Sequence, residues 1–524
     1  MPLQSDTAHV LNGQLAGARN AAGDVLSFKG VPYARPPVGA LRWQPPQPPE
    51  NWFGARDATA FGPRSIQPNR PTTSVSYFGP ERESEDCLYL NVWTAATSAD
   101  ERRPVMVWFH GGAYQVGSGA LPIFDGENLA RRGVIVVTVN YRLGPLGFLA
   151  HPDLTKRSKD KSSGNFGLLD SVAALAWVRD NIAAFGGDPG RVTIFGQSVG
   201  ASTVCCLMAS PLARGLFHRA IGESGATVAT PGRVGGGSMP TLEQAEQRGL
   251  AYAKALGSPS LDELLTMDAR DIQLRVAEQR LTRGTPVNDG HMFPEPVHDI
   301  FLKRQQAQVP LLTGSNSHEG STRPAPTELV AVLKEISGDF GAPADELVAL
   351  YMKDSGMTPA DASRQIGGHR CFNWQNWTWA RLHARASQAP VFYYHFSHQS
   401  PIAMDRPWFE NRADKLGAFH TAEIPYVFQS FAARDWAWRD SDRQLSDLMA
   451  SYWTNFAANG DPNGPGLPAW DRFNSARPQA MHFDGGAAMG SVPDRAKLDA
   501  IDAFYAQQSR NHAWTLTETP ATAE

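Results

Sequence analysis

Short continuous runs of apolar, β-branched residues constrain the fold of this chain more than any other feature. The runs are Pro104–His110 (PVMVWFH), Gly133–Arg142 (GVIVVTVNYR) and Arg191–Gly196 (RVTIFG). Continuous rather than alternating apolar character is typical of strands that are buried on both faces, as in a parallel sheet. The segment Gly167–Phe185 has the apolar spacing of an amphipathic helix and ends at GGDPG. Strand, helix, strand in this order predicts an α/β fold.

The remainder of the chain is less regular. The first 100 residues are rich in Pro and Gly, which predicts short strands and loops rather than a regular packed layer. Residues 241–390 are predicted to be mostly helical, with two loop-like interruptions, TPVNDGHMFPEP and LLTGSNSHEGSTRPAP. Val391–Phe396 predicts another strand, and Ser446–Gly460 predicts a long helix.

Composition argues against several classes of partner. With 48 basic and 52 acidic residues the net charge is −4, so no basic excess exists to attract nucleic acid or an anionic membrane. No stretch approaches the roughly 20 apolar residues of a membrane span, and no secretory signal is recognisable. Four cysteines make no disulfide framework, and no CxxC or HExxH occurs, so neither a metal nor a cofactor is expected. We therefore expect a cytoplasmic protein; monomer and dimer both stay open.

The sequence GQSVG, Gly196–Gly200, is the only GxSxG in the chain. It follows the strand-like VTIF and precedes the helix-like ASTVCCLMAS, which is the context of a nucleophile elbow. A sharp strand-to-helix turn leaves no room for bulk two residues before or after the serine. The pattern predicts that Ser198 is a nucleophile. The alternative is a glycine-flanked turn serine without chemistry.

A second glycine-containing loop, His110–Tyr114 (HGGAY), directly follows the strand-like PVMVWF. Backbone N–H groups in such a loop can approach a ligand oxygen and stabilise the anion of a tetrahedral intermediate. The expected donors are the amides of Gly112 and Ala113, together with that of Val199 after the serine. The alternative is a connecting loop without this role.

Several motifs together resemble type-B carboxylesterases, the α/β-hydrolase group that includes cholinesterases and bacterial para-nitrobenzyl esterases. The matching segments occur in family order along nearly the whole chain: FKGVPYARPPVGALRW, SEDCLYLNVW, HGGAY, VNYRLGPLGFL, the run from Gly164 to Ala201, GESGA, HEG, GAFHTAEIPYVF and YWTNFAANGDPN. The resemblance implies a central, mostly parallel twisted sheet flanked by helices, with long helical and loop insertions around an active-site gorge. It also implies one catalytic domain over residues 1–510, followed by a polar tail over 511–524.

The resemblance supplies the other members of a catalytic triad. The family's acid lies in a segment like GSNSHEG, which gives Glu319, and its base lies in a segment like GAFHTAEIPY, which gives His420. Chemistry requires such partners, because a serine hydroxyl is a poor nucleophile without a base, and the base needs an orienting carboxylate. Ser224 in GESGA resembles a serine that hydrogen-bonds the acid. The alternatives are a solvated loop carboxylate for Glu319 and a capping or packed histidine for His420.

Two ion pairs are also implied by the resemblance, with structural rather than catalytic roles. Arg42 with Glu85 would hold an early loop, and Arg142 with Asp170 would join a strand end to the following helix.

The chain departs from the family pattern at several positions. Where relatives close a loop with a disulfide to Cys87, this chain has Ser65, so Cys87 is expected to be unpaired. The usual Glu-Ser-Ala of the elbow is Gln-Ser-Val here, and the larger Val199 could narrow the acyl pocket. The cholinesterase tryptophan that binds quaternary ammonium corresponds to Tyr77, followed by Phe78, which weakens a choline-ester assignment. Arg323 is considered as a site for an anionic substrate but is expected to be a surface residue.

These features predict a serine hydrolase of small to medium carboxylic esters that works through an acyl-enzyme, with a small-molecule ester as partner. The alternatives are related hydrolases on the same scaffold, acting on carbamates, amides, lipids or xenobiotic and toxin esters. A third class, a non-catalytic binding homologue, is disfavoured because Ser198, Glu319 and His420 are all present.

Overall fold

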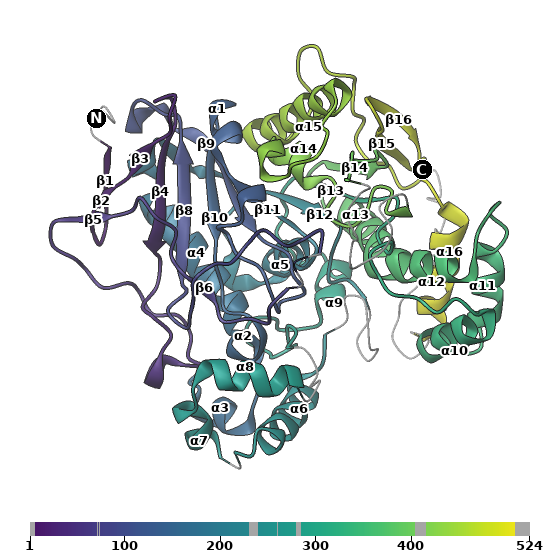
Figure 1. Cartoon of the computed structure of the whole chain (residues 1–524), viewed down its shortest axis with the longest axis horizontal. Coiled ribbons are helices and arrows are strands. Elements are labelled where there is room, and N and C mark those ends of the chain that lie inside the picture. The colour runs from purple at the N-terminus through teal and green to yellow at the C-terminus, as the bar shows by residue number, and fades with distance from the viewer. Residues whose placement is uncertain are drawn as a thin grey trace, which may run out of the picture.

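An eleven-stranded sheet crosses the molecule from edge to edge (Figure 1). The computed structural model describes residues 6–70, 72, 74–229, 239–258, 260–278, 284–403 and 415–508, so the tail predicted over 511–524 lies outside the described residues. The strand order is β16 (Ala487–Ser491), β15 (Gln479–Phe483), β14 (Val391–Phe396), β13 (Leu311–Asn316), β12 (Arg219–Glu223), β11 (Gly187–Gln197), β9 (Arg103–Phe109), β10 (Ile135–Val139), β8 (Tyr89–Thr94), β4 (Leu26–Pro32) and β3 (Ala18–Arg19). The neighbours from β15 to β10 pair parallel, and the outer strands pair antiparallel.

Strand β9 shows why the central runs are apolar without alternation. Val105 and Val107 face one hydrophobic core, whereas Met106 and Trp108 face another on the opposite side of the sheet, and all four are fully buried. A strand covered on both faces gains from an apolar side chain at every position. The strands predicted at 104–110, 133–142, 191–196 and 391–396 are confirmed as β9, β10, β11 and β14.

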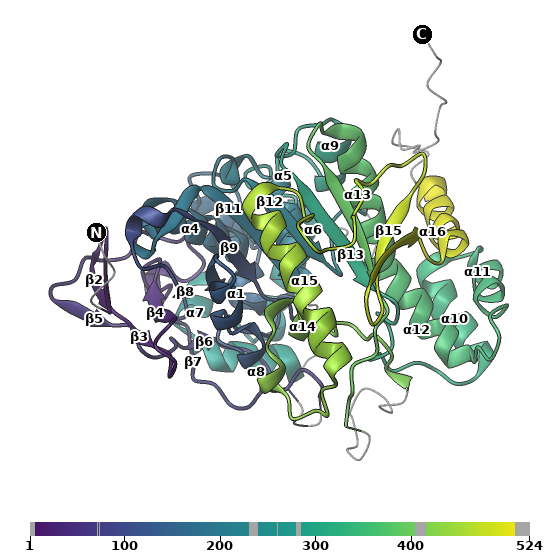
Figure 2. The same ribbon diagram turned by 90° about the horizontal axis from the view of Figure 1, so that it is seen from above.

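Helices cover both faces of the sheet, as Figure 2 shows from above. The core that contains Val105 also holds α4 (Phe166–Asn181), α5 (Val199–Ala209), α9 (Val297–Leu302) and α13 (Trp374–Ala386). The core that contains Met106 holds α1 (Glu127–Arg131), α14 (Ile424–Phe428) and α15 (Asp440–Asn459). Within the described ranges, none of the helices combines the length and apolar character that crossing a bilayer requires.

The remaining elements form insertions beside the sheet. One helical insertion consists of α2 (Gly144–Phe148), α3 (Pro152–Arg157), α6 (Leu242–Ala255), α7 (Leu261–Thr266) and α8 (Ala269–Glu278). The other consists of α10 (Leu329–Phe340), α11 (Ala344–Tyr351), α12 (Pro359–Gly368) and α16 (Arg495–Gln508) (Figure 1). Two small sheets are formed by β1 (Thr7–Val10), β2 (Gly13–Ala16) and β5 (Ala55–Asp57), and by β6 (Arg64–Ser65) with β7 (Glu83–Ser84). The expected mostly parallel sheet with helical insertions is therefore confirmed.

Two expectations about local structure are wrong. The start of the predicted loop LLTGSNSHEGSTRPAP is strand β13, because its six residues are buried between β12 and β14 although Thr, Gly, Ser and Asn reduce its strand character. The N-terminal region is also more regular than predicted, since β4 and β8 extend the main sheet. The long helix over 446–460 is confirmed, but α15 begins earlier, at Asp440.

Candidate active site

Ser198 occupies the sharp turn between β11 and α5. Its φ of 60° and ψ of −126° are unusual for a residue with a side chain, and its amide is held by a 2.9 Å hydrogen bond to the carbonyl of Glu223. A Cβ at Gly196 would lie 2.6 Å from the Gly200 backbone, and one at Gly200 would lie 1.9 Å from the Phe109 carbonyl oxygen. The two glycines are therefore required by close backbone packing, which fixes the direction of the serine side chain.

The loop that follows β9 lies beside this turn. Gly112, Ala113 and Tyr114 have φ values of 119°, 58° and 58°, and a Cβ at Gly112 would lie 1.8 Å from the Val116 carbonyl oxygen. The Gly112 carbonyl accepts from the amides of Gln115 and Val116 at 2.9 and 3.0 Å. Within the described part of the chain, the amides of Gly112 and Ala113 have no hydrogen-bond acceptor. The loop thus presents two unsatisfied donors next to Ser198.

His110 supports the start of the same loop from the interior. Its ring stacks on Tyr141 with 4.5 Å between centroids, and the Tyr141 hydroxyl donates to the His110 carbonyl at 2.6 Å. Burial lowers the pKa of His110 to about 4, so its side chain is neutral in the folded protein at pH 7. His110 is therefore a packing residue and carries no charge into the site.

Glu319 and His420 come from separate loops that are joined by backbone pairing. A parallel bridge links His318 to Phe419, and the His318 amide donates to the Ala418 carbonyl at 3.1 Å. His420 Nδ1 lies 2.6 Å from Glu319 Oε2, and the other Glu319 oxygen accepts from the Asn316 amide at 2.7 Å. The Glu319 side chain is fully buried and that of His420 is 17% exposed. The carboxylate therefore sits behind the imidazole, and the imidazole reaches the pocket.

Two further side chains contact the imidazole. Phe372 stacks on His420 with 4.1 Å between ring centroids. The amide nitrogen of Gln197, the residue before Ser198, lies 3.3 Å from both ring nitrogens of His420. These contacts and the carboxylate restrict the orientation of the ring.

Ser224 does not make the bond that the resemblance implies. Its hydroxyl donates to Glu423 Oε1 at 3.4 Å rather than to Glu319, and the other Glu423 oxygen accepts from Asn316 Nδ2 at 2.5 Å. The reason is that Glu423 is inserted between the Ser224 turn and the strand that leads to Glu319. The backbone N–H of Asn316 donates to Glu319, and its side chain donates to Glu423. Asn316 therefore connects Ser224 to the acid indirectly.

Two buried glutamates under the site were not assigned a role by sequence reasoning. Glu223 accepts from Trp453 Nε1 at 2.7 Å, and its neighbour in space is Glu423. Burial and the charge of Glu423 raise the pKa of Glu223 well above its usual value. Burial, followed by the charge of Glu319, raises the pKa of Glu423 to about 7. The available signal was that both glutamates lie in the matching segments GESGA and GAFHTAEIPYVF.

A pocket of about 790 Å³ opens above these residues and is lined by Ser198, His420, Gly112 and Ala113, among others. Most of its remaining wall is apolar and aromatic, including Phe78, Phe124, Phe372, Phe419 and Trp436. The aromatic wall expected from the sequence comes from Phe78, whereas Tyr77 faces an adjoining cavity of about 520 Å³. Val199 does not narrow the pocket, because its side chain packs against the hydrophobic core.

The other residues singled out in the sequence also have defined contacts. Arg42 pairs with Glu85 at 2.6 Å, and Arg142 pairs with Asp170 at 2.7 Å, as expected. All four cysteines are unpaired, and the buried thiol of Cys87 has Ser65, rather than a second cysteine, as a side-chain neighbour. Arg323 lies outside the pocket lining and pairs with Glu335 at 3.4 Å, so it holds no substrate there.

Comparison with known proteins gives one consistent result. The model of the carboxylesterase family matches residues 4–501. The chain is 36% identical to the fumonisin B1 esterase of Sphingopyxis macrogoltabida, with 93% of this chain and 89% of that protein covered. It is also 36% identical to the para-nitrobenzyl esterase of Bacillus subtilis, with 91% and 95% covered. Among solved structures, a carboxylesterase of Geobacillus stearothermophilus superimposes with a TM-score of 0.81 at 30% identity, with 94% of this chain and 99% of that chain covered.

Proposed function

The chain belongs to the carboxylesterase family, has the α/β-hydrolase fold and is a serine carboxylic-ester hydrolase, and from that premise we propose that Ser198, Glu319 and His420 are its catalytic triad. The observation that carries the proposal is the 2.6 Å contact of Glu319 with a His420 ring that shares one pocket with the strained Ser198. A strained serine beside an oriented imidazole is the arrangement needed for nucleophilic attack.

Acylation begins when His420 accepts the proton of Ser198 and the serine oxygen attacks the ester carbonyl. Glu319 holds the ring through Nδ1 and stabilises the imidazolium that forms. Because Glu319 is buried and accepts a second hydrogen bond from the Asn316 amide, it is preorganised for this role.

The amides of Gly112, Ala113 and Val199 are proposed to form the oxyanion hole. Val199 is the first residue of α5, where the amide has no intrahelical acceptor and the helix dipole favours negative charge. The amides of Gly112 and Ala113 are held by the turn at Gly112. Three fixed donors stabilise the tetrahedral intermediate, and one such donor contributes about 10² to 10³ in rate.

Deacylation repeats these steps with water. Acylation ends when the ester bond to the alcohol breaks and His420 donates its proton to the leaving alcohol; in deacylation His420 takes a proton from a water molecule that attacks the acyl-enzyme and then returns it to the Ser198 oxygen. The bond between the acyl carbon and the Ser198 oxygen breaks, which releases the carboxylic acid and restores the serine. The pocket volume and its aromatic lining support esters of small to medium size as substrates.

The compartment is proposed to be the reducing cytoplasm. All four cysteines, which lie in the described residues, are unpaired, and position 65, where relatives would carry the disulfide partner of Cys87, is a serine. Proteins of oxidising compartments use disulfides at such positions more often.

The proposal is tested by covalent labelling and turnover of Ser198→Ala. The wild type should gain the mass of one phosphonyl group from a fluorophosphonate and hydrolyse 4-nitrophenyl butyrate, and Ser198→Ala should do neither. Ser202→Ala is the matched control, since Ser202 lies one helical turn further on and its hydroxyl donates to the Ala226 carbonyl. Turnover by Ser198→Ala at the wild-type rate would exclude this serine as the nucleophile.

A further inference from the structure

Helix α8 has a polar side chain in its buried stripe. Four residues at the i, i+3, i+4 and i+7 spacing of one helical face are buried: Ala269, Ile272, Gln273 and Val276. Three of them are apolar, whereas Gln273 brings a carboxamide into the stripe with only 3% of the residue exposed. Removing a carboxamide from water is unfavourable unless other hydrogen bonds replace those to water. Gln273 therefore needs a hydrogen-bond partner at this position.

The protein itself does not supply that partner within the ranges that the structure describes. Oε1 of Gln273 is enclosed and accepts no hydrogen bond from any described residue. Several other enclosed side-chain atoms lack a partner as well, but among the described residues only Gln273 combines such an atom with a place in the lining of the pocket at Ser198. An enclosed polar group without a partner is stabilised when a bound molecule supplies one. The position of Gln273 in the lining indicates that its partner is a ligand in the pocket.

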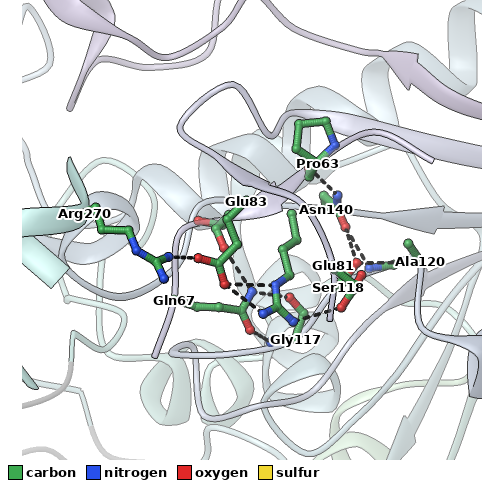
Figure 3. Close-up of polar contacts among 12 residues, drawn as sticks. Pro63, Gln67, Glu81, Glu83, Gly117, Ser118, Ala120, Asn140 and Arg270 are labelled. Carbon is green, nitrogen blue, oxygen red and sulfur yellow. Dashed lines mark hydrogen bonds and ion pairs between the residues drawn. The ribbon is translucent and has the colours of Figure 1, made fainter. Parts of the chain in front are cut away.

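Two other glutamines near the pocket show how this type of side chain is satisfied elsewhere in the protein. Gln67, which lines the adjoining cavity, donates to the Gly117 carbonyl at 2.9 Å and accepts from the Gly117 amide at 2.7 Å (Figure 3). The amide nitrogen of Gln197 contacts the His420 ring. Gln273 differs from both, since its carboxamide oxygen faces no donor in the described part of the chain.

The Gln273 carboxamide lies close to the loop that carries the proposed oxyanion donors. A Cβ at Gly144 would lie 3.0 Å from Gln273 Oε1, so the carboxamide packs against the backbone of this glycine. The Gly144 amide donates to the Tyr114 carbonyl at 2.7 Å, and Tyr114 directly follows Ala113. Gln273 is thus connected to the reacting centre through two residues. A ligand group that binds at Gln273 therefore belongs to the same molecule whose ester lies at Ser198.

The carboxamide can offer either of its polar atoms to a ligand. Rotation about the last side-chain bond of a glutamine has a broad energy profile, and the group accepts through its oxygen and donates through its nitrogen. A hydroxyl group matches both atoms, because it also donates and accepts. A charged group would match only one of them and would lose its hydration in a wall that Val276 and the aromatic residues make apolar. The chemistry of this position therefore favours a neutral hydroxyl.

We propose that Gln273 determines specificity and that the preferred substrates are esters with a neutral hydroxyl group remote from the scissile bond. This inference rests on the proposed function, and it names a substrate class for the same site. The apolar and aromatic lining accommodates the rest of the ester. An apolar pocket without a polar partner would favour a methyl group over a hydroxyl, whereas a pocket that hydrogen-bonds the hydroxyl rejects the analogue that lacks it.

The test compares esters in which a hydroxyl replaces a methyl group of similar size. On the acyl side, 4-nitrophenyl esters of ω-hydroxy acids with six to ten carbons are compared with those of the unsubstituted acids that are one carbon longer. On the alcohol side, 4-(2-hydroxyethyl)phenyl butyrate is compared with 4-propylphenyl butyrate. Values of kcat/KM are divided by the rates of hydroxide hydrolysis to remove intrinsic reactivity. The hydroxyl preference is the ratio of these values for the two esters of a pair, and in at least one pair it should exceed unity.

Gln273→Met identifies the residue responsible, because methionine keeps the approximate shape of the side chain and removes its carboxamide. In the preferred pair the hydroxyl preference should fall by about tenfold. The free energy of unfolding, measured by urea denaturation, should equal or exceed that of the wild type, since the oxygen that is removed has no partner in the described residues.

Gln306→Met is the matched control. Gln306 is also buried and its Oε1 also lacks a partner among the described residues, but it lies outside the pocket lining. Its nitrogen lies 3.2 Å from His383 Nδ1, so this glutamine has a contact within the protein. The substitution should leave the hydroxyl preference unchanged and should lower the free energy of unfolding.

Two results would overturn the inference while leaving the proposed function intact. One is a hydroxyl preference that is the same in the wild type and in Gln273→Met for every pair. The other is a lower free energy of unfolding for Gln273→Met, which would show that the protein itself satisfies the carboxamide. In both cases the methyl esters would still be hydrolysed by the wild type and Ser198→Ala would still be inactive. Failure of every ester in the wild type would instead contradict the proposed function.

Discussion

The floor of the pocket and its wall are held by different kinds of contact. The floor, formed by Gly111–Ala113 and Gly196–Gly200, is packed backbone against backbone, with less than 3 Å available for a Cβ at either glycine of the elbow. The wall loop, which comprises the described residues 66–70, 72 and 74–82 between β6 and β7, is held mainly by side chains: Arg434 bonds two of its carbonyls, and Arg64 pairs with Glu81. Backbone packing tolerates almost no substitution, whereas side-chain contacts can be exchanged. The difference suggests that the reaction is fixed by the floor and that substrate choice depends on the wall.

The largest effect should come from Glu319→Gln under the floor. The amide can no longer accept from both His420 and the Asn316 amide, so the imidazole loses its correct tautomer and orientation. We expect kcat to fall by ~10³ to 10⁴ with little change in KM. Steady-state kinetics with 4-nitrophenyl butyrate measures this, and Glu335→Gln is the control, since Glu335 pairs with Arg323 away from the pocket. Equal kcat values for the two variants would contradict the role of Glu319.

Gly200→Ala tests how little room the floor has. The added Cβ would lie 1.9 Å from the Phe109 carbonyl oxygen, so the strand or the helix must shift. We expect a loss of ~3 kcal/mol or more in the free energy of unfolding, measured by urea denaturation, and loss of most activity. Gly338→Ala, within α10, is the control, because nothing lies within 4 Å of its Cβ position. There alanine should be neutral or stabilise by ~0.5 to 1 kcal/mol.

Glu423, which lies beneath the floor, makes the free energy of unfolding depend on pH. Its pKa is raised from 4.5 to about 7, so between these pH values the folded protein keeps a proton that the unfolded chain releases. Stability should therefore decrease as pH rises through this window, by on the order of 2 kcal/mol from this group. Glu423→Gln, a neutral isostere, should lose that decrease, so that its stability relative to the wild type increases between pH 5 and 8. Urea denaturation at both pH values measures the difference, and a constant difference would argue against a protonated Glu423.

A disulfide at the base of the wall loop would restrict the backbone of the wall, as close backbone packing restricts that of the floor. Ser65 is a side-chain neighbour of Cys87 at the base of the wall loop, so Ser65→Cys places two thiols near each other. A disulfide that closes about 20 residues contributes ~3 kcal/mol, from which ~1 kcal/mol is lost with the bond from the Leu143 amide to the Ser65 hydroxyl. We expect the oxidised variant to be about 2 kcal/mol more stable than the wild type. Thiol titration and urea denaturation test this, and two free thiols after oxidation would show that the geometry is unsuitable.

The sequence allowed much of the central sheet to be predicted, and less of its edges. The runs that became β9, β10, β11 and β14 are apolar at almost every position, because both of their faces are covered. The sequence predicts a loop where strand β13 lies, since residues Thr313–Asn316 are small or polar and only the neighbouring strands make the segment extended. Pairing with distant strands cannot be recognised in the local sequence of a segment.

The same distinction applies to the site. The elbow and the loop Gly112–Ala113 have local signatures, whereas His420 was selected only through the family resemblance from among 14 histidines. The link from Ser224 to Glu423 and the bonds of Arg434 to the wall loop could not be predicted, because they depend on segments more than 190 residues apart in the chain. The roles of the triad residues stay predictions until the variants are measured.

Because Ser198 has a positive φ, the backbone sets the direction of its side chain, whereas the hydroxyl group supplies the chemistry. The backbone turn, and not the hydroxyl, points position 198 into the pocket, and the amide bond to Glu223 holds it there. The side chain at position 198 can thus be exchanged while the surrounding groups keep their positions. A thiol at 198 would be offered to the same imidazole and the same amides, so this scaffold is a suitable starting point for acyl-transfer catalysts with other nucleophiles.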